Sequence, residues 1–274
     1  TGTPVDTLSC HYHKLRFNNS GPEADSAGLR RVVILGHTGF IGTKLEKFFR
    51  SCSPKIDLLG ISVDAPESSI DLTRSDALDR VSSYFDPQTA VIMLSAIKRQ
   101  LGDNLDNFLK NLAMVSNISR ILQNRPVGRF VYFSSSAVYG EDIHNVRITE
   151  ETPVQPTSYY GMAKYAAERL FQKAVEKQNP NCLLILRPVT VYGPGEPETA
   201  YSPGGFIKSL QAGKPISLWG DGTERREFLF IEDLVDLTRR LTFHGYSGVV
   251  NLAGGRSHTF REVISIASKI LQIQ

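Results

Sequence analysis

Short apolar runs alternate with longer amphipathic segments along most of this chain, beginning at Arg31. Six runs predict strands, and they read RVVILG, IDLLGI, AVIMLSA, RFVYFSS, LLILRP and VVNLAG. The segments that predict helices lie at about residues 40–50, 75–85, 103–124, 157–178, 231–243 and 259–272. Because each run is apolar throughout, the sheet is expected to be covered on both faces. The alternation therefore predicts an α/β fold with a doubly wound parallel sheet, in which ligands bind at the carboxyl ends of the strands.

The composition is that of a globular chain, with 41% hydrophobic and 22% charged residues among 274. A net charge of +3, without a basic cluster interleaved with aromatic residues, argues against a nucleic-acid partner. A membrane partner is not expected, because no apolar run is long enough to span a bilayer. Cys10, Cys52 and Cys182 are scattered and odd in number, which indicates the reducing cytoplasm. No zinc-like ligand pair accompanies the CHYH segment, so no metal site is expected.

Three glycines follow the first predicted strand. The segment LGHTGFIGTKLEKFF places Gly36, Gly39 and Gly42 at the turn from that strand into the next helix. Missing side chains let the backbone approach a pyrophosphate there, and the helix N-terminus faces the anion. A glycine can also be only a turn or packing residue, but the strand before and the helix after are the context that this motif needs. We therefore predict a dinucleotide site that includes Phe40 and Ile41 of the same motif.

The end of the second predicted strand bears on the choice of cofactor. An acidic residue there usually binds the adenosine ribose of NAD, whereas a basic residue accommodates the extra phosphate of NADP. The run LLGISVD places Ser62 at the strand end and Asp64 two residues further on. Asp64 can bind the ribose or can be an ordinary solvated loop carboxylate. The sequence favours NAD and leaves NADP open.

Hydroxyl, phenol and amine groups follow the fourth predicted strand. The segment FSSSAVYG places Ser134, Ser135 and Ser136 at the carboxyl end of that strand, and Tyr160 lies four residues before Lys164 on the next predicted helix. Positions four apart share one face of a helix, so the pair can also be ordinary packing. Together with the glycine motif, it indicates acid–base chemistry. The pKa of a free phenol is about 10, and we expect the Lys164 ammonium, together with the positive nicotinamide of oxidised cofactor, to lower the pKa of Tyr160.

These and later segments resemble the short-chain dehydrogenase/reductase superfamily, and within it the extended nucleotide-sugar epimerase/dehydratase branch that includes UDP-glucose 4-epimerases. The resemblance runs from about Arg31 to the end of the chain and rests on GHTGFIG, FSSSAVYG, YGMAK, LRPVTVYGPG and GDGTERREFLFIEDL. It implies an NAD-dependent enzyme with a nucleotide-sugar substrate, and a homodimer that pairs the helices at 103–124 and 157–178. It also implies a substrate lobe that normally continues beyond KILQIQ.

The resemblance assigns roles to individual residues. It implies that Ser135, Tyr160 and Lys164 are catalytic, with Lys164 also touching the nicotinamide ribose. Asp71 and Leu72 match the pair that contacts adenine. The positions implied to bind the substrate are Ser136, Thr190, which replaces an asparagine of the family pattern, and Arg226, which matches an arginine that contacts the nucleotide diphosphate.

The residues after Ser135 bear on the reaction. Sugar 4,6-dehydratases of the family carry Asp-Glu there, whereas this chain has Ser136 and Ala137, so elimination lacks its acid and base. The cysteine of the epimerase-reductases that make fucose precursors is also missing. The prediction that remains is a nucleotide-sugar epimerase at C4, which oxidises the sugar to a ketosugar and returns the hydride to the other face. An NADPH-dependent ketosugar reductase and a non-catalytic dinucleotide-binding protein stay open.

These predictions divide the chain into three parts. Residues 1–28 are rich in Thr, Ser, Asn, Gly and Pro and are predicted to be a disordered leader. Residues 29–188 are predicted to form the dinucleotide-binding Rossmann domain. Residues 189–274 are predicted to form mainly the substrate-binding lobe, with a strand at 249–254 that returns to the Rossmann sheet.

Local signals complete the picture of the second half. Prolines and glycines between residues 188 and 203 predict loops. Arg187 is expected to end its strand with its charge in solvent. Thr259 and Glu262 predict a capping box at the start of the last helix.

Overall fold

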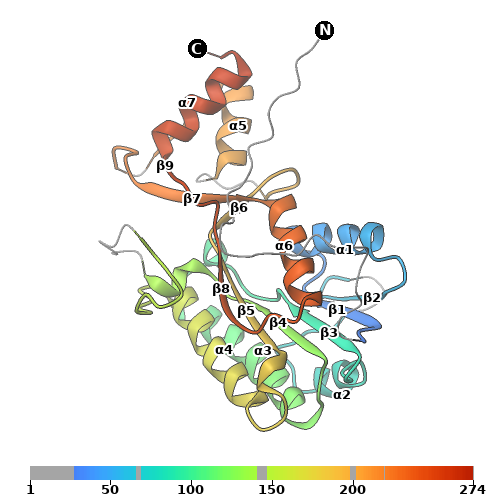
Figure 1. Ribbon diagram of the computed structural model, residues 1–274. Coiled ribbons are helices and arrows are strands. Elements are labelled where there is room, and N and C mark those ends of the chain that lie inside the picture. The colour runs from blue at the N-terminus through green and yellow to red at the C-terminus, as the bar shows by residue number, and fades with distance from the viewer. Residues whose placement is uncertain (1–27, 66–68, 141–146, 198–201, 219, 274) are drawn as a thin grey trace.

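The computed structural model describes residues 28–65, 69–140, 147–197, 202–218 and 220–273. The predicted leader therefore lies, apart from its last residue, outside the described residues. Figure 1 shows a large sheet with its helices in the lower part of the molecule and a small sheet with two helices above it.

A six-stranded sheet forms the centre of the fold (Figure 1). Its order is β2-β1-β3-β4-β5-β8, and every neighbouring pair is parallel. The strands are β1 (Arg31–Leu35), β2 (Asp57–Ile61), β3 (Thr89–Met93), β4 (Arg129–Phe133), β5 (Leu183–Pro188) and β8 (Gly248–Leu252). They correspond to the apolar runs of the sequence, so the prediction of a doubly wound parallel sheet is confirmed. The strand order reverses between β1 and β3, which is where such sheets bind their ligands.

Helices cover both faces of the large sheet. Those on one face are α2 (Ala77–Ser82), α3 (Leu105–Asn124) and α4 (Tyr159–Val175), and those on the other are α1 (Phe40–Cys52) and α6 (Ile231–Phe243). Successive strand residues point to opposite faces, so Val33 belongs to the first core and Ile34 to the second. This two-sided burial explains why the apolar residues of each run are consecutive rather than alternating.

A three-stranded sheet follows β5 and carries the upper part of the molecule (Figure 1). Its strands are β6 (Thr190–Tyr192), β7 (Arg225–Phe230) and β9 (Ser257–Thr259). The helices α5 (Pro203–Gln211) and α7 (Phe260–Leu271) pack against each other beside it. The predicted capping box is present, because Thr259 and Glu262 each bond to the backbone N–H of the other.

The prediction of loops between residues 188 and 203 is wrong at two places. The strand β6 lies within this segment, and α5 begins at Pro203. Proline is compatible with the first position of a helix because the N–H there has no partner within the helix. Ser202 caps α5 by accepting a hydrogen bond from the N–H of Gly205 at 3.1 Å.

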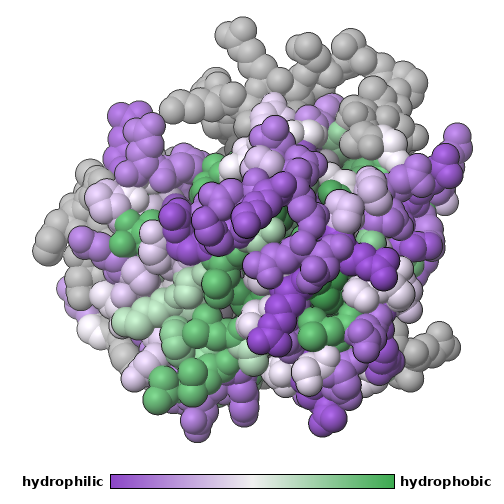
Figure 2. Space-filling view, turned by 90° about the horizontal axis from the view of Figure 1, so that it is seen from below, coloured by the Kyte–Doolittle hydropathy of each residue, from purple (hydrophilic) through white to green (hydrophobic). Residues whose placement is uncertain are grey.

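Hydrophobic residues gather on the face that is seen from below, where α2, α3 and α4 lie (Figures 1 and 2). The exposed large hydrophobic residues of α3 and α4 are Leu105, Leu109, Tyr159, Met162 and Leu170. Among the described helices, none combines the length and the apolar character needed to cross a membrane.

Candidate active site

The three predicted glycines form the turn between β1 and α1. Gly36 has a φ of +91°, and a Cβ added at Gly42 would lie 2.4 Å from the carbonyl oxygen of Gly36. Residues with side chains could not close this turn onto the helix. Gly39 is the N-cap of α1 and provides no side-chain cap, so N–H groups of the first turn are left for another partner. Phe40 and Ile41 begin α1 and pack on the core. The turn fits the pyrophosphate of a dinucleotide.

The end of β2 lies beside the glycine turn. Thr38 Oγ1 donates a 2.6 Å hydrogen bond to Asp64 Oδ1, and this bond is the main reason that the pKa of the exposed Asp64 carboxyl is lowered. The buried Ser62 hydroxyl accepts from the N–H of Thr38 at 3.3 Å and lies 3.1 Å from His37 Nδ1. The structure therefore brings Asp64 to the turn as an ionised carboxylate.

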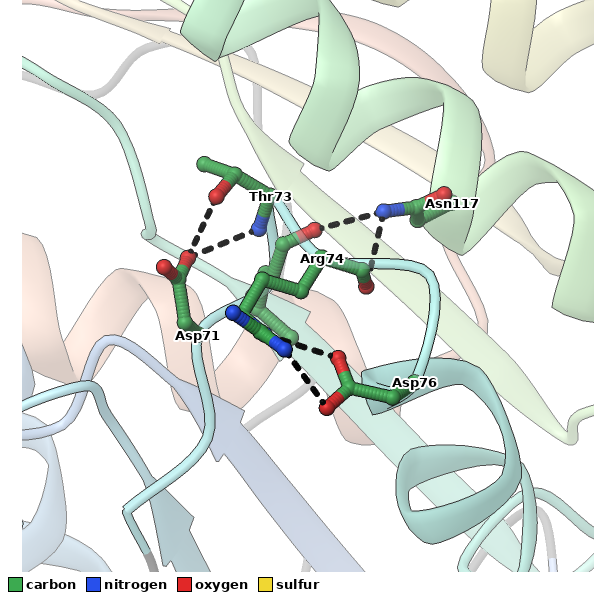
Figure 3. A network of polar contacts seen from close by, with 6 residues as sticks. Asp71, Thr73, Arg74, Asp76 and Asn117 are labelled. Atoms are coloured by element: carbon green, nitrogen blue, oxygen red, sulfur yellow. Dashed lines mark hydrogen bonds and ion pairs between the residues drawn. The ribbon is translucent and has the colours of Figure 1, made fainter.

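Asp71 and Leu72 lie in a loop that is held against α3 (Figure 3). Asp71 Oδ1 accepts hydrogen bonds from the N–H and Oγ1 of Thr73, at 2.9 and 2.7 Å. Nδ2 of the buried Asn117 donates to the carbonyl oxygens of Leu72 and Arg74, at 2.9 and 3.1 Å. Asn117 was not predicted, and the only signal for it is a polar residue on the apolar face of a helix.

Ser135, Tyr160 and Lys164 meet where β4 ends and α4 begins. Ser135 Oγ accepts from the N–H of Ala137 at 3.2 Å, and hydrogen bonding between the Ser135 and Tyr160 side chains acts to lower the pKa of Tyr160. Lys164 Nζ lies 5.7 Å from the centre of the Tyr160 ring and donates a 2.6 Å hydrogen bond to the carbonyl oxygen of Phe133. The structure thus brings the three predicted catalytic residues into one cluster.

The close approach of α4 to this cluster depends on Gly161. A Cβ at this position would lie 2.6 Å from the carbonyl oxygen of Ala137. Ser158 caps the helix by accepting from the N–H of Gly161 at 3.0 Å, and Asp103 accepts from the N–H of Tyr160 at 3.0 Å. The glycine in YGMAK is therefore a packing requirement of the site.

Desolvation dominates the electrostatics of the Tyr160 and Lys164 pair. It raises the pKa of Tyr160 to about 12, although the hydrogen bond from Ser135 acts in the opposite direction. It lowers the pKa of Lys164 to about 7; the negative charge of Glu168 opposes this shift and the positive charge of Lys98 adds to it. In the protein without NAD the pKa of Tyr160 is raised rather than lowered, because the cost of removing a phenolate from water exceeds the effect of the Ser135 hydrogen bond.

Arg187 is buried in an ion pair, so the prediction of a solvated charge is wrong. Its Nε and Nη2 donate to the two carboxylate oxygens of Glu168 at 2.9 and 2.6 Å, and the two side chains are 5% and 2% exposed. Its Nη1 donates to Tyr139 at 2.8 Å, and the Tyr139 hydroxyl donates to Asn251 Oδ1 at 2.8 Å. Ser134 Oγ donates to Glu168 at 2.5 Å. Glu168 was not predicted, and its place one helical turn after a buried lysine is the signal that could have identified it.

The sequence matches the NAD dependent epimerase/dehydratase family over residues 32–258. The chain belongs to this family. The prediction of an NAD(P)-dependent enzyme with a Rossmann fold, from a family that acts on nucleotide sugars, is confirmed by this membership.

Curated relatives and solved structures include both epimerases and reductases. The uncharacterized UDP-glucose epimerase YtcB of Bacillus subtilis is 26% identical over 264 residues, which cover 88% of this chain and 82% of the relative. The GDP-6-deoxy-D-mannose reductase of Pseudomonas aeruginosa is 27% identical over 257 residues, which cover 89% and 81%. The structure of RMD from Pseudomonas aeruginosa complexed with NADPH matches with a TM-score of 0.75 at 26% identity and covers 89% of this chain and 85% of that one.

In this member of the epimerase/dehydratase family, the predicted substrate residues lie on two different sheets. Ser136 begins the short 3-10 turn that directly follows Ser135. Thr190 is exposed at the start of β6, and Arg226 lies on the neighbouring strand β7, where it forms an ion pair with Glu224. The cluster of Ser135, Tyr160 and Lys164 comes from the large sheet and α4, whereas Thr190 and Arg226 come from the small sheet.

The described residues were compared with the requirements of a metal site and of a reactive cysteine. Within those ranges, no group of three or more His, Cys, Asp or Glu residues could hold a metal ion. Cys52 is free and exposed, and Cys182 is free and buried. Burial raises the pKa of the Cys182 thiol to about 11, which makes it a poor nucleophile.

Proposed function

We propose that the chain is an NAD-dependent nucleotide-sugar epimerase that acts at C4 of the sugar. The observation that carries this proposal is the cluster at the end of β4, in which Ser135 bonds to Tyr160 and the Lys164 amine lies beside the phenol ring. These are the groups needed to move a proton while a sugar hydroxyl and a ketone interconvert. The cofactor is assigned to residues 29–188, and the substrate mainly to residues 189–274.

In this proposal, Tyr160 exchanges the proton of the sugar hydroxyl. Its phenolate accepts the proton when the hydroxyl becomes a ketone, and the phenol returns the proton when the ketone is reduced. Ser135 donates a hydrogen bond to the same sugar oxygen. The Lys164 ammonium stabilises the phenolate, and its pKa of about 7 lets it gain or lose a proton near neutral pH. Bound NAD supplies the acceptor and donor of hydride.

The residues proposed to hold NAD lie along the carboxyl edge of β1 and β2. The turn at Gly36, Gly39 and Gly42 offers backbone N–H groups to the pyrophosphate. Asp64 lies beside this turn with a lowered pKa, and its negative charge would repel the extra phosphate of NADP. Asp71 is proposed to bind adenine with Leu72, and Lys164 to contact the nicotinamide ribose.

The absence of carboxylates after Ser135 supports epimerisation over elimination. Ser136 and Ala137 occupy the two positions that follow, and the N–H of Ala137 already bonds to Ser135. Neither residue can protonate a leaving hydroxyl or remove a proton from carbon at neutral pH. On the substrate side, Ser136, Thr190 and Arg226 are proposed to contact the nucleotide sugar.

Replacing Tyr160 by phenylalanine tests the proposal. The variant removes one oxygen, so turnover of UDP-, GDP- or dTDP-sugars should fall by about two to four orders of magnitude while NAD stays bound. Tyr159→Phe is the matched control, because the neighbouring Tyr159 is 41% exposed and its ring packs on Phe108. Equal activity in both variants would reject the assignment and favour a non-catalytic dinucleotide-binding protein.

The second candidate is an NADPH-dependent nucleotide-ketosugar reductase. It is favoured by the reductase relative from Pseudomonas aeruginosa and by the NADPH complex that shares the fold. The two candidates differ in how the cofactor is used, because an epimerase regenerates NAD in each cycle whereas a reductase consumes NADPH. Denaturing the purified protein and identifying what it releases separates them. Tightly held NAD supports the epimerase, and an empty protein that then takes up NADPH supports the reductase.

A homodimer and a cytoplasmic location are also proposed. The helices α3 and α4 expose Leu105, Leu109 and Met162, and exposed hydrophobic residues of this kind are suited to pairing with a second copy. Sedimentation of the purified protein tests the dimer, and a Leu109→Lys variant should sediment as a monomer. The location rests on the scattered cysteines alone.

A further inference from the structure

Three residues of α4, each one helical turn after the last, bond to three consecutive residues at the end of β4. The pairs are Tyr160 with Ser135, Lys164 with the carbonyl of Phe133, and Glu168 with Ser134. Residues four apart lie on one face of a helix, so this face of α4 contacts the strand end at three points. The proposed function uses the first two pairs and leaves Glu168 without a role.

Glu168 differs from most carboxylates of the chain in its burial and its partners. The residue is 1% exposed, and Lys164 is 4% exposed. Its Oε1 accepts hydrogen bonds from Ser134 and Arg187 at 2.5 and 2.9 Å, and its Oε2 accepts from Arg187 at 2.6 Å. The carboxylate therefore joins α4 to the ends of β4 and β5 at once.

Lys164 Nζ is surrounded by a backbone carbonyl oxygen, two aromatic rings and the charges of Glu168 and Lys98. Its Nζ lies 5.0 Å from the centre of the Tyr132 ring and 5.7 Å from that of Tyr160, and the nearby charge of Lys98 disfavours the ammonium. Glu168 is the charged group that favours the ammonium. A negative charge one helical turn away is close enough to change the protonation of a buried amine.

We propose that Glu168 is a positioning residue for Lys164 and Ser135. It fixes the end of β4 through Ser134 and holds Lys164 as an ammonium beside Tyr160. The inference rests on the proposed function, in which Lys164 acts as a cation and Ser135 contacts the sugar oxygen.

The rival explanation is that Glu168 only neutralises Arg187. A buried ion pair of that kind can often be replaced by uncharged groups of similar volume without loss of stability. If Glu168 has no further role, such a replacement should leave Lys164 unchanged. The two explanations therefore differ in the protonation of Lys164 rather than in stability.

The test is the double variant Glu168→Gln/Arg187→Met, which removes both charges and leaves neither one unpaired. The pKa of Lys164 is measured by NMR of its side-chain amine. The Lys164 signal is identified as the one that is missing from the spectrum of Lys164→Met. We expect this pKa to fall by about one to two units, and the alkaline loss of kcat to move to lower pH by the same amount. Glu176→Gln is the control on the same helix, because Glu176 is exposed and pairs with Lys173.

An unchanged Lys164 pKa in a folded double variant overturns the proposal. The NMR measurement needs no turnover, so it decides the role of Glu168 even if Tyr160→Phe shows that the chain is not an epimerase. If the double variant does not fold, Ser134→Ala replaces it, because this change removes only the bond to β4. That variant should lower kcat by about fivefold with KM unchanged, and an unchanged kcat would overturn the proposal.

Discussion

The glycine turn and the cluster of Ser135, Tyr160 and Lys164 lie along the same edge of one sheet, yet they are built in opposite ways. The turn at Gly36, Gly39 and Gly42 is backbone that leaves no room for an added carbon at its tightest point. The cluster at Tyr160 and Lys164 consists of side chains whose protonation is set by burial and by neighbouring charges. We therefore expect added side-chain atoms to disrupt the structure of the glycine turn, and changed charges to alter the protonation of Tyr160 and Lys164.

Gly42→Ala should give the largest effect. Alanine normally favours a helix over glycine, but its Cβ would lie 2.4 Å from the carbonyl oxygen of Gly36. Moving the turn to relieve this overlap should lower the free energy of unfolding by about 3 kcal/mol and weaken NAD binding. Chemical denaturation and calorimetric titration measure the two effects.

Gly39→Ala is the control for this prediction. A Cβ there would lie 3.5 Å from the carbonyl oxygen of Gly36, which is an ordinary contact. The variant should keep the stability of the parent and lose only affinity for NAD. Equal losses of stability at Gly39 and Gly42 would contradict the description of the turn.

Lys164→Met should change how stability depends on pH. The folded pKa of Lys164 is about 7, whereas that of a lysine in an unfolded chain is about 10.4. Between these values the unfolded state binds one more proton, so the parent gains stability from Lys164 as pH rises. The stability of the parent minus that of the variant should therefore increase by about 2 kcal/mol from pH 7.5 to 9.

Lys173→Met provides the comparison for this measurement. Lys173 lies on the same helix, is exposed and pairs with Glu176. Its removal should leave the pH dependence of unfolding as it is in the parent. If the difference in stability between the parent and Lys164→Met also stays constant with pH, the pKa of Lys164 is not lowered by burial.

Asn117→Leu should give the smallest effect of the three. The variant keeps the branching of the side chain and its number of heavy atoms, but it leaves the carbonyl oxygens of Leu72 and Arg74 without their donor (Figure 3). We expect a loss of about 1 kcal/mol of stability and about fivefold weaker NAD binding. Asn124→Leu is the control on α3, because Asn124 is exposed and bonds only within its own helix, to Arg120. Equal NAD affinity in the two variants would show that Asn117 is not needed to hold the loop at Asp71 and Leu72 for binding.

The fold could be predicted because apolar residues on its central strands follow one another without alternating with polar ones. Val33 and Ile34 are adjacent but belong to different cores. A sheet with one face in solvent would instead alternate apolar and polar residues. The glycine turn and the spacing of Tyr160 from Lys164 could also be recognised, since both depend on residues close together in the sequence. Ser135, joined to this pair by the family resemblance, completes the cluster that the structure brings together at the end of β4.

The rest could not be predicted because it depends on partners far apart in the chain. Arg187 reads as a solvated strand end until Glu168 is placed beside it. The pKa of Tyr160 was predicted in the wrong direction for the protein without NAD, because burial raises it and the sequence alone does not report burial at that position. The helix at Pro203 was missed because proline was interpreted as a breaker, whereas Ser202 makes it the first residue of a capped helix.

The spacing of contacts along α4 limits how this chain can change during evolution. A residue inserted between Tyr160 and Glu168 would turn everything beyond it by about 100° around the helix axis and carry Glu168 away from β4. An exposed position such as Leu170 has no partner on β4 to keep. Descendants of this chain can therefore change such positions of α4 one by one, while insertions and deletions will accumulate in the loops around the site and not within this helix.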